Sequence, residues 1–193
     1  MQLKDRTFVL IDTETTGFDK EKHQLLEVGM LVIKDLKVVD KLELKIKHKE
    51  YVVTAGAMSA NKIDLLEHNK EGIDPQTACY EIMSFLRNNM DFTEEKGSAF
   101  IPIGQNIDFD LGFLEQLFLK NYKIKDYRLC MSYRKLDIMQ VALVKSLEGK
   151  IELESQSLDS LLEALNIDMP EDRHRAIVDC YLEFEVLNRL LSL

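Results

Sequence analysis

The sequence has few cysteines and no apolar run long enough to cross a bilayer. Its three cysteines, Cys79, Cys130 and Cys180, are widely spaced and odd in number. This argues against a disulfide framework and against a zinc site of the CxxC type, and it favours a reducing, cytoplasmic setting. The first residues are charged where a signal peptide would be apolar, so we expect no membrane association.

Basic residues are also scarce. There are 25 lysines and arginines against 34 aspartates and glutamates, which gives a formal net charge of −9. Proteins that hold nucleic acid mainly by neutralising its phosphates are usually basic. The charge therefore argues against a general nucleic-acid binder, but not against an enzyme whose bound cations supply positive charge.

Internal repeats, low-complexity tracts and proline-rich linkers are absent as well, so we expect one domain over residues 1–193. Apolar or alternating runs predict strands at 7–14, 25–33 and 41–47, in an antiparallel meander with a lysine-bearing edge, and a further strand at 99–104. Helices are predicted at 74–90, 109–122, 137–147, 157–166 and 173–192, with short helical pieces over 54–70 and a polar break at 94–98. Strands followed by alternating helices and strands indicate an α/β domain with a mixed sheet.

Two acids stand at the end of the first predicted strand, in the segment VLIDTETT. Side chains two residues apart on a strand face the same way, so Asp12 and Glu14 would lie side by side and Thr13 would face away. Carboxylates this close repel each other unless a cation intervenes, and Mg²⁺ or Mn²⁺ prefers such oxygen ligands. A strand end that merely opens into solvent is the plainer alternative.

Two further segments carry acids near element ends. Asp110 falls at the start of a predicted helix, where Asp108 fits a capping role at least as well. In DRHRAIVDC, Asp179 lies inside an apolar helical stretch, whereas His174 belongs to the preceding loop or first turn. A lone histidine between arginines is more often simply exposed.

Taken together, these residues suit two divalent metal ions held about 4 Å apart for in-line hydrolysis of a phosphodiester. A histidine near neutral pKa could accept a proton from the attacking water. The cations would also compensate the four carboxylates.

The sequence resembles the DEDDh 3′–5′ exonucleases in three ordered motifs: DTETTG (12–17), N-x-x-FD-x-x-FL (106–114) and HRAxxD (174–179). That family includes the proofreading subunit of bacterial replicative polymerases and stand-alone DNases and RNases. The resemblance covers nearly the whole chain. It implies an RNase H-like α/β fold with a mixed five-stranded sheet flanked by helices.

The resemblance also implies roles for single residues. Asp12 would bridge both ions, and Glu14 and Asp179 would complete the tighter site. Asp110 would support the second ion and His174 would be the general base. The implied substrate-binding residues are Thr15, Phe18, Asn61 and Asn106, where Phe18 could either stack on a base or pack beside the sheet.

This chain departs from many relatives in having Gln105 before the motif asparagine and Asn61-Lys62-Ile63 where they carry His-Gly-Ile. These departures concern substrate contacts and not the metal set. The basic and aromatic stretch KNYKIKDYR (120–128) could guide a single strand, but a solvated loop between helices is favoured. His23, His48 and His68 are expected at the surface.

The function implied is a metal-dependent 3′–5′ exonuclease that shortens single-stranded DNA from its 3′ end and releases nucleoside monophosphates. Two alternatives stay open. One is an exoribonuclease of the same family, since the same residues serve both chemistries. The other is a proofreading-fold subunit that acts mainly as the partner of a DNA polymerase.

Overall fold

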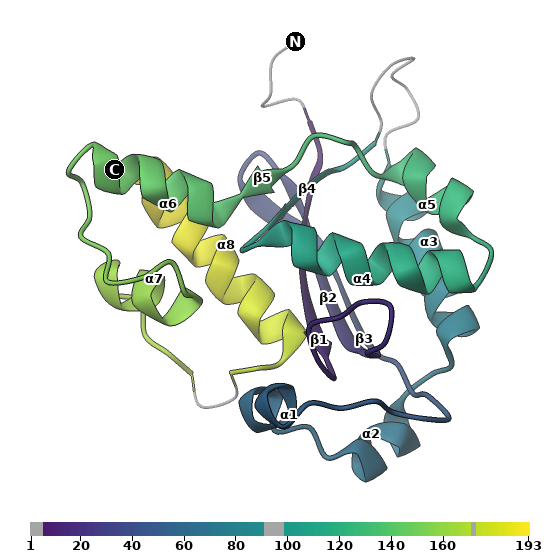
Figure 1. The fold of residues 1–193 in the computed structure, drawn as a ribbon. Coiled ribbons are helices and arrows are strands. Elements are labelled where there is room, and N and C mark those ends of the chain that lie inside the picture. Colours follow the sequence, from purple (N-terminus) through teal and green to yellow (C-terminus); the bar gives the residue numbers. More distant parts are fainter. Residues whose placement is uncertain (1–5, 91–98, 171–172) are drawn as a thin grey trace.

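A five-stranded mixed sheet forms the centre of the computed structural model, which describes residues 6–90, 99–170 and 173–193 (Figure 1). Its order is β3-β2-β1-β4-β5; β1 pairs with β2 and β2 with β3 in antiparallel fashion, whereas β4 and β5 run parallel to β1. The strands are β1 (Phe8–Thr15), β2 (Leu25–Lys34), β3 (Lys37–Lys45), β4 (Ile101–Gly104) and β5 (Leu136–Asp137). The predicted mixed sheet and its opening meander are confirmed.

Helices cover both faces of this sheet. One apolar core lies between the sheet and α3, α4 and α5, and a second lies between the sheet and α6, α7 and α8. The helices of the described residues are α1 (Ala55–Asn61), α2 (Leu65–Glu71), α3 (Pro75–Asn89), α4 (Ile107–Lys120), α5 (Ile124–Cys130), α6 (Ile138–Leu147), α7 (Leu158–Ala164) and α8 (Ala176–Ser192). None of them is both long and apolar enough to cross a membrane.

The two cores explain why β1 is an unbroken apolar run. Val9 and Ile11 point into the core beneath α3, α4 and α5, whereas Leu10 points into the core beneath α8. Because side chains alternate along a strand, Asp12 and Glu14 continue the α8 face and Thr13 continues the α4 face. The sheet thus carries the two acids toward the start of α8.

The third strand begins four residues earlier than predicted. A two-residue hairpin turn at Asp35 and Leu36, both with positive φ (49° and 55°), joins Lys34 to Lys37. Such turns favour Asn-Gly or Asp-Gly. Because leucine occupies the second position here, the sequence did not indicate a turn. The strand is an edge strand with exposed lysines, as predicted.

The stretch 120–128 is not a solvated loop, so that prediction is wrong. It enters α5, and Tyr127 is buried and stacks on Phe118 with ring centroids 4.6 Å apart. The surface prediction is also wrong for His68, which is 5% exposed and donates to the Ile46 carbonyl over 3.1 Å. His48 is half-buried and donates to the Leu25 carbonyl over 2.8 Å.

The remaining differences are small. The helix expected at 109–122 begins at Ile107, the last helix begins at Ala176 instead of 173, and the two-residue strand β5 was not predicted. The polar break at 94–98 lies outside the described residues.

Candidate active site

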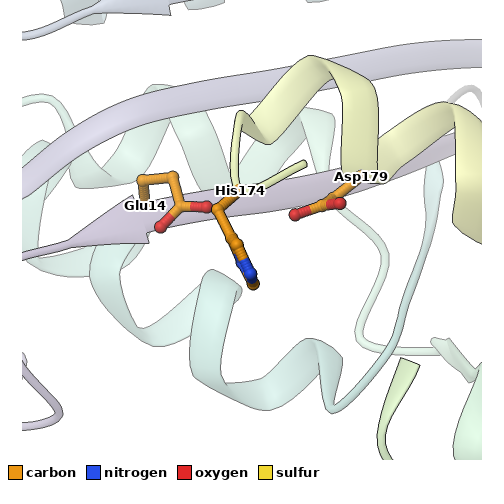
Figure 2. A group of neighbouring side chains, drawn as sticks. All are labelled: Glu14, His174 and Asp179. Atoms are coloured by element: carbon orange, nitrogen blue, oxygen red, sulfur yellow. The ribbon is translucent and has the colours of Figure 1, made fainter. Parts of the chain in front are cut away.

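Glu14, His174 and Asp179 meet at the end of β1 nearest the start of α8. One potential ligand atom from each lies within 4.8 Å of the others. Figure 2 shows the two carboxylates and the imidazole converging from β1, from the loop before α8 and from the helix itself. Glu14 and His174, which are 160 positions apart in the sequence, are therefore neighbours in the fold, as the resemblance implied.

His174 lies in the loop that precedes α8, and its backbone has a left-handed conformation with φ of 64°. Non-glycine residues rarely adopt this conformation. It lets the chain turn sharply at Arg175, which is the N-cap of the helix, so that Asp179 falls in the first turns of α8. The structure therefore confirms the predicted placement of the histidine outside the helix and the aspartate inside it.

Asp110 reaches the strand from the other side of the sheet. It lies in the first turn of α4, is 3% exposed, and accepts a hydrogen bond of 2.6 Å from the Thr13 hydroxyl. Asp108 is exposed and forms an ion pair with Lys135. The structure thus separates the two aspartates, which suited a capping role equally well: Asp110, the residue that the resemblance selects, is buried and Asp108 is exposed.

Burial and mutual repulsion raise the pKa values of the carboxyl groups of Asp12, Glu14 and Asp110. Burial raises the pKa of Asp12 well above its usual range, and the charges of Glu183, Asp110, Glu14 and Asp179 raise it further. Burial also raises the pKa of Glu14 to about 8, with further contributions from Asp179 and Glu27, and that of Asp110 to about 7. Carboxylates that destabilise one another in this way fit a hard divalent cation.

Glu183 is a buried acid that sequence reasoning missed. It is 2% exposed, and its Oε2 accepts a hydrogen bond of 3.1 Å from the backbone N–H of Gln105, between β4 and α4. Burial raises its pKa well above the usual range, and the nearby charge of Asp110 adds to this. The sequence signal was available, because Glu183 follows Asp179 by four positions and so shares its helix face.

Glu27 is a second missed residue, and it fixes the start of α8. Its carboxylate accepts hydrogen bonds from the Arg175 guanidinium (3.2 Å) and from the backbone N–H of Ala176 (3.4 Å). Gly29, opposite Asp12 in the sheet, lets the helix come this close, because a Cβ there would lie 2.5 Å from the Ala176 carbonyl. The sequence signal for this contact was the position of Glu27, a charged residue within the apolar run of strand β2.

The four predicted substrate-binding residues differ in how far their side chains are exposed to solvent. Phe18 is 79% exposed beside Phe109, and Asn106 is exposed with a left-handed backbone at the N-cap of α4. Thr15 and Asn61 are buried: the Thr15 hydroxyl donates to the Gly17 carbonyl, and the Asn61 amide donates to the Thr15 carbonyl over 3.1 Å. Asn61 therefore supports the end of β1, and its predicted substrate contact stays a prediction.

Comparison with protein families decides the relationship. A family model described as "Exonuclease" (RNase_T) matches residues 9–187, nearly the whole described domain. The chain belongs to this exonuclease family. The family match agrees with the DEDDh resemblance.

Members and structural relatives of the exonuclease family extend this comparison. The chain is 27% identical over 190 residues to the PolC-type DNA polymerase III of Thermotoga petrophila. The alignment covers 98% of this chain but only 12% of the polymerase. It is 30% identical over 129 residues to ribonuclease T of Buchnera aphidicola, covering 63% of this chain and 57% of that protein. The chain thus spans about an eighth of the length of the PolC-type relative.

The fold matches that of exonuclease I. The structure of E. coli exonuclease I in complex with a dT13 oligonucleotide superposes with a TM-score of 0.79 at 19% identity, covering 97% of this chain and 41% of that one. A zinc-bound complex of the same enzyme with single-stranded DNA gives a TM-score of 0.80 at 19% identity, covering 97% and 40%. The predicted RNase H-like fold is therefore confirmed.

Without metal, this family member should lose stability as the pH rises from about 4.5 to about 8. The native carboxyl groups, with pKa values of about 8 for Glu14 and about 7 for Asp110, bind more protons than they do in the unfolded chain. The free energy of unfolding then falls with pH, by about 1.4 kcal/mol per pH unit for each such group. Urea unfolding in EDTA across this range measures the slope.

A Glu183→Gln variant serves as the matched test of this slope. Glutamine keeps the size of the side chain and an oxygen that can accept from Gln105, but it removes one buried carboxyl group, so its stability should fall less steeply with pH. Added Mg²⁺ or Mn²⁺ should flatten the slope in the unmodified protein, because the ion favours the charged carboxylates. Stability that rises over this range in EDTA would contradict the burial argument.

Proposed function

We propose that the protein is a metal-dependent 3′–5′ exonuclease that shortens single-stranded DNA and releases nucleoside monophosphates. The observation that carries this proposal is the convergence of Glu14, His174 and Asp179 within 4.8 Å, next to the buried carboxyl groups of Asp12 and Asp110. The relationship to polymerases and to exonuclease I supports it.

The donor set fits two divalent ions, Mg²⁺ or Mn²⁺. Asp12 would bridge the two, Glu14 and Asp179 would hold one, and Asp110 would support the other. When bound, such ions acidify the attacking water and neutralise charge on the phosphoryl oxygens. The repulsion that raises the pKa of Asp12 is the physical reason for expecting cations here.

The protein's own residues would place and deprotonate the water. His174 would accept its proton as general base, since a ring nitrogen lies within 4.8 Å of a carboxylate oxygen of Glu14 and of Asp179. Attack at phosphorus breaks the bond to the 3′ oxygen of the preceding nucleotide, which leaves a new 3′ end and a nucleoside 5′-monophosphate. The exposed ring of Phe18 offers a stacking surface for a terminal base, with Asn106 exposed at the N-cap of α4.

Two alternatives come from the relatives. The relationship to ribonuclease T favours an exoribonuclease with the same residues. The relationship to a PolC-type polymerase favours a cytoplasmic role beside a DNA polymerase. A subunit that acts only as such a partner has no need of the four acids and the histidine, so their presence favours an active enzyme.

Incubation of the purified protein with 5′-labelled DNA and RNA oligomers tests these proposals. We expect a ladder of DNA products shortened from the 3′ end in Mg²⁺ or Mn²⁺, and none in EDTA. Shortening of RNA alone would replace the proposal with the exoribonuclease alternative. If neither strand is shortened, the enzymatic proposal fails; cleavage that resists EDTA would refute the metal mechanism.

A further inference from the structure

A pocket of about 360 Å³ lies beside the β1–β2 connection, and none of the active-site acids lines it. Its walls come from that connection, from the segment after β3, from Pro75 at the start of α3 and from the second half of α4. In Figure 1 the connection passes directly below α4, which runs across the front of the molecule. The volume falls in the range of ordinary ligand sites.

The pocket is positively charged in a protein that is otherwise acidic. Lys20, Lys49 and Lys120 line it, against a single carboxylate, Glu50. Within the described ranges, Lys20 and Lys49 have no carboxylate partner, and Lys120 donates only to the backbone carbonyl of Glu21 over 3.1 Å. Three ammonium groups lining one cavity against a single carboxylate leave an excess of positive charge, which favours an anionic ligand.

Its position along α4 links the pocket to the active site. Lys120 follows Asp110 by ten residues, which is about 15 Å along a helix axis. Lys20 lies between the two, because its side chain packs on α4 where a Cβ on Gly112 would lie 3.0 Å from the lysine Cδ. The pocket therefore begins close to the catalytic end of α4 and extends away from it.

A series of aromatic rings follows the same direction. The ring centroids of Phe18 and Phe109 are 6.3 Å apart, those of Phe109 and Phe113 are 4.9 Å apart, and Phe113 lines the pocket. Phe113 is buried, at 3% exposed, and forms part of the pocket wall, whereas Phe18 is 79% exposed. Phe18 is therefore the ring of this series that can stack on a base of a single strand.

We propose that this lysine pocket binds backbone phosphates of the substrate strand, a few nucleotides to the 5′ side of the terminal nucleotide. The proposal rests on the proposed exonuclease function and names the contact that holds the strand outside the catalytic centre. Ammonium groups suit this task because they bind phosphate as point charges and read no base. A local cluster of lysines also explains how a chain with a net charge of −9 can hold a polyanion.

The test is strand binding by a variant with Lys20→Gln, Lys49→Gln and Lys120→Gln. Anisotropy of a labelled 12-nucleotide dT strand is measured in EDTA, where no hydrolysis interferes, at several salt concentrations. Each phosphate contact contributes about 0.7 to the slope of log K against log salt, so three should reduce that slope by about 2 and weaken binding about tenfold. The matched control replaces Lys34, Lys37 and Lys150, which changes net charge equally at sites away from the pocket.

Substrate length provides the second measurement. In Mg²⁺ the variant should raise KM for the 12-nucleotide strand about tenfold and leave a dinucleotide, too short to reach the pocket, unchanged. An equal loss on both lengths, or equal slopes in the variant and the control, would overturn the proposal. So would weaker binding of free dTMP with an unchanged slope for the strand, because the pocket would then hold a free nucleotide.

These results separate the pocket from the proposed function. If the unmodified protein cleaves neither length, the exonuclease proposal fails, while the salt slopes in EDTA still decide whether the lysines hold a strand. Normal cleavage with unchanged slopes would instead refute the pocket alone.

Discussion

Replacing Asp12 with asparagine is expected to lower kcat by about a thousandfold or more. Asp12 is the residue on which the charges of Glu183, Asp110, Glu14 and Asp179 all act, so its carboxylate lies at the centre of the acidic group. Asparagine has nearly the same shape but cannot supply the negative charge that two ions would share. Losing one electrostatic contact of this kind typically reduces kcat by about 10²–10³, and a bridging ligand serves both ions.

The measurement is single-turnover cleavage of a labelled DNA strand at saturating Mg²⁺ or Mn²⁺. Asp108→Asn is the matched control, since that aspartate is on the same helix as Asp110 but is exposed and paired with Lys135. It should retain activity within a few-fold. Asp12→Asn should fold at least as stably as the unmodified protein in EDTA, because it removes a buried carboxyl group. Cleavage by Asp12→Asn within tenfold of the unmodified protein would contradict the assigned metal site.

Removing the imidazole of His174 is expected to reduce kcat by about 10²–10⁴, the usual contribution of a general base. Asparagine is the better replacement for this purpose than alanine. The backbone at this position has φ of 64°, a conformation that asparagine tolerates better than most residues. Comparing His174→Asn with His174→Ala therefore separates loss of the base from strain in the loop before α8.

Two measurements distinguish a general base from a metal ligand at this position. If His174 only accepts a proton, Mn²⁺ affinity measured by calorimetry stays the same in His174→Asn while kcat falls, and an added small base such as imidazole restores part of kcat. If it binds metal, affinity falls together with kcat. The second outcome would refute the general-base role, and the proximity of the ring to Glu14 and Asp179 makes it a real test.

Much of this site could be predicted because its information is local. The alternation along β1 is enough to place Asp12 and Glu14 on one face and Thr13 on the other, and the structure agrees. The loop position of His174 also followed from its spacing to Asp179. Helix signals alone could not choose between Asp108 and Asp110, because both suit a first helical turn. The resemblance selects Asp110, which the structure shows in contact with Thr13.

The supporting contacts were harder to predict because they join distant segments. Glu27 touches Arg175 and Ala176 across the sheet, and Glu183 touches Gln105. A single sequence reveals such residues only as acids in apolar surroundings, without naming their partners. The hairpin at Asp35 and Leu36 was missed for another reason. The pairing of β2 with β3 fixes its backbone, and the turn lacks the residues that usually favour this conformation.

The proposed catalytic residues come from β1, from α4, from the loop before α8 and from α8 itself. During synthesis, Asp12, Glu14 and Asp110 are therefore made long before His174 and Asp179. Under the proposed roles, a nascent chain that ends before His174 and α8 would hold an incomplete set of ligands and no general base. If the proposed function is correct, hydrolytic activity begins only when the final helix docks on the sheet, so that a partly made chain cannot degrade the nucleic acids around it.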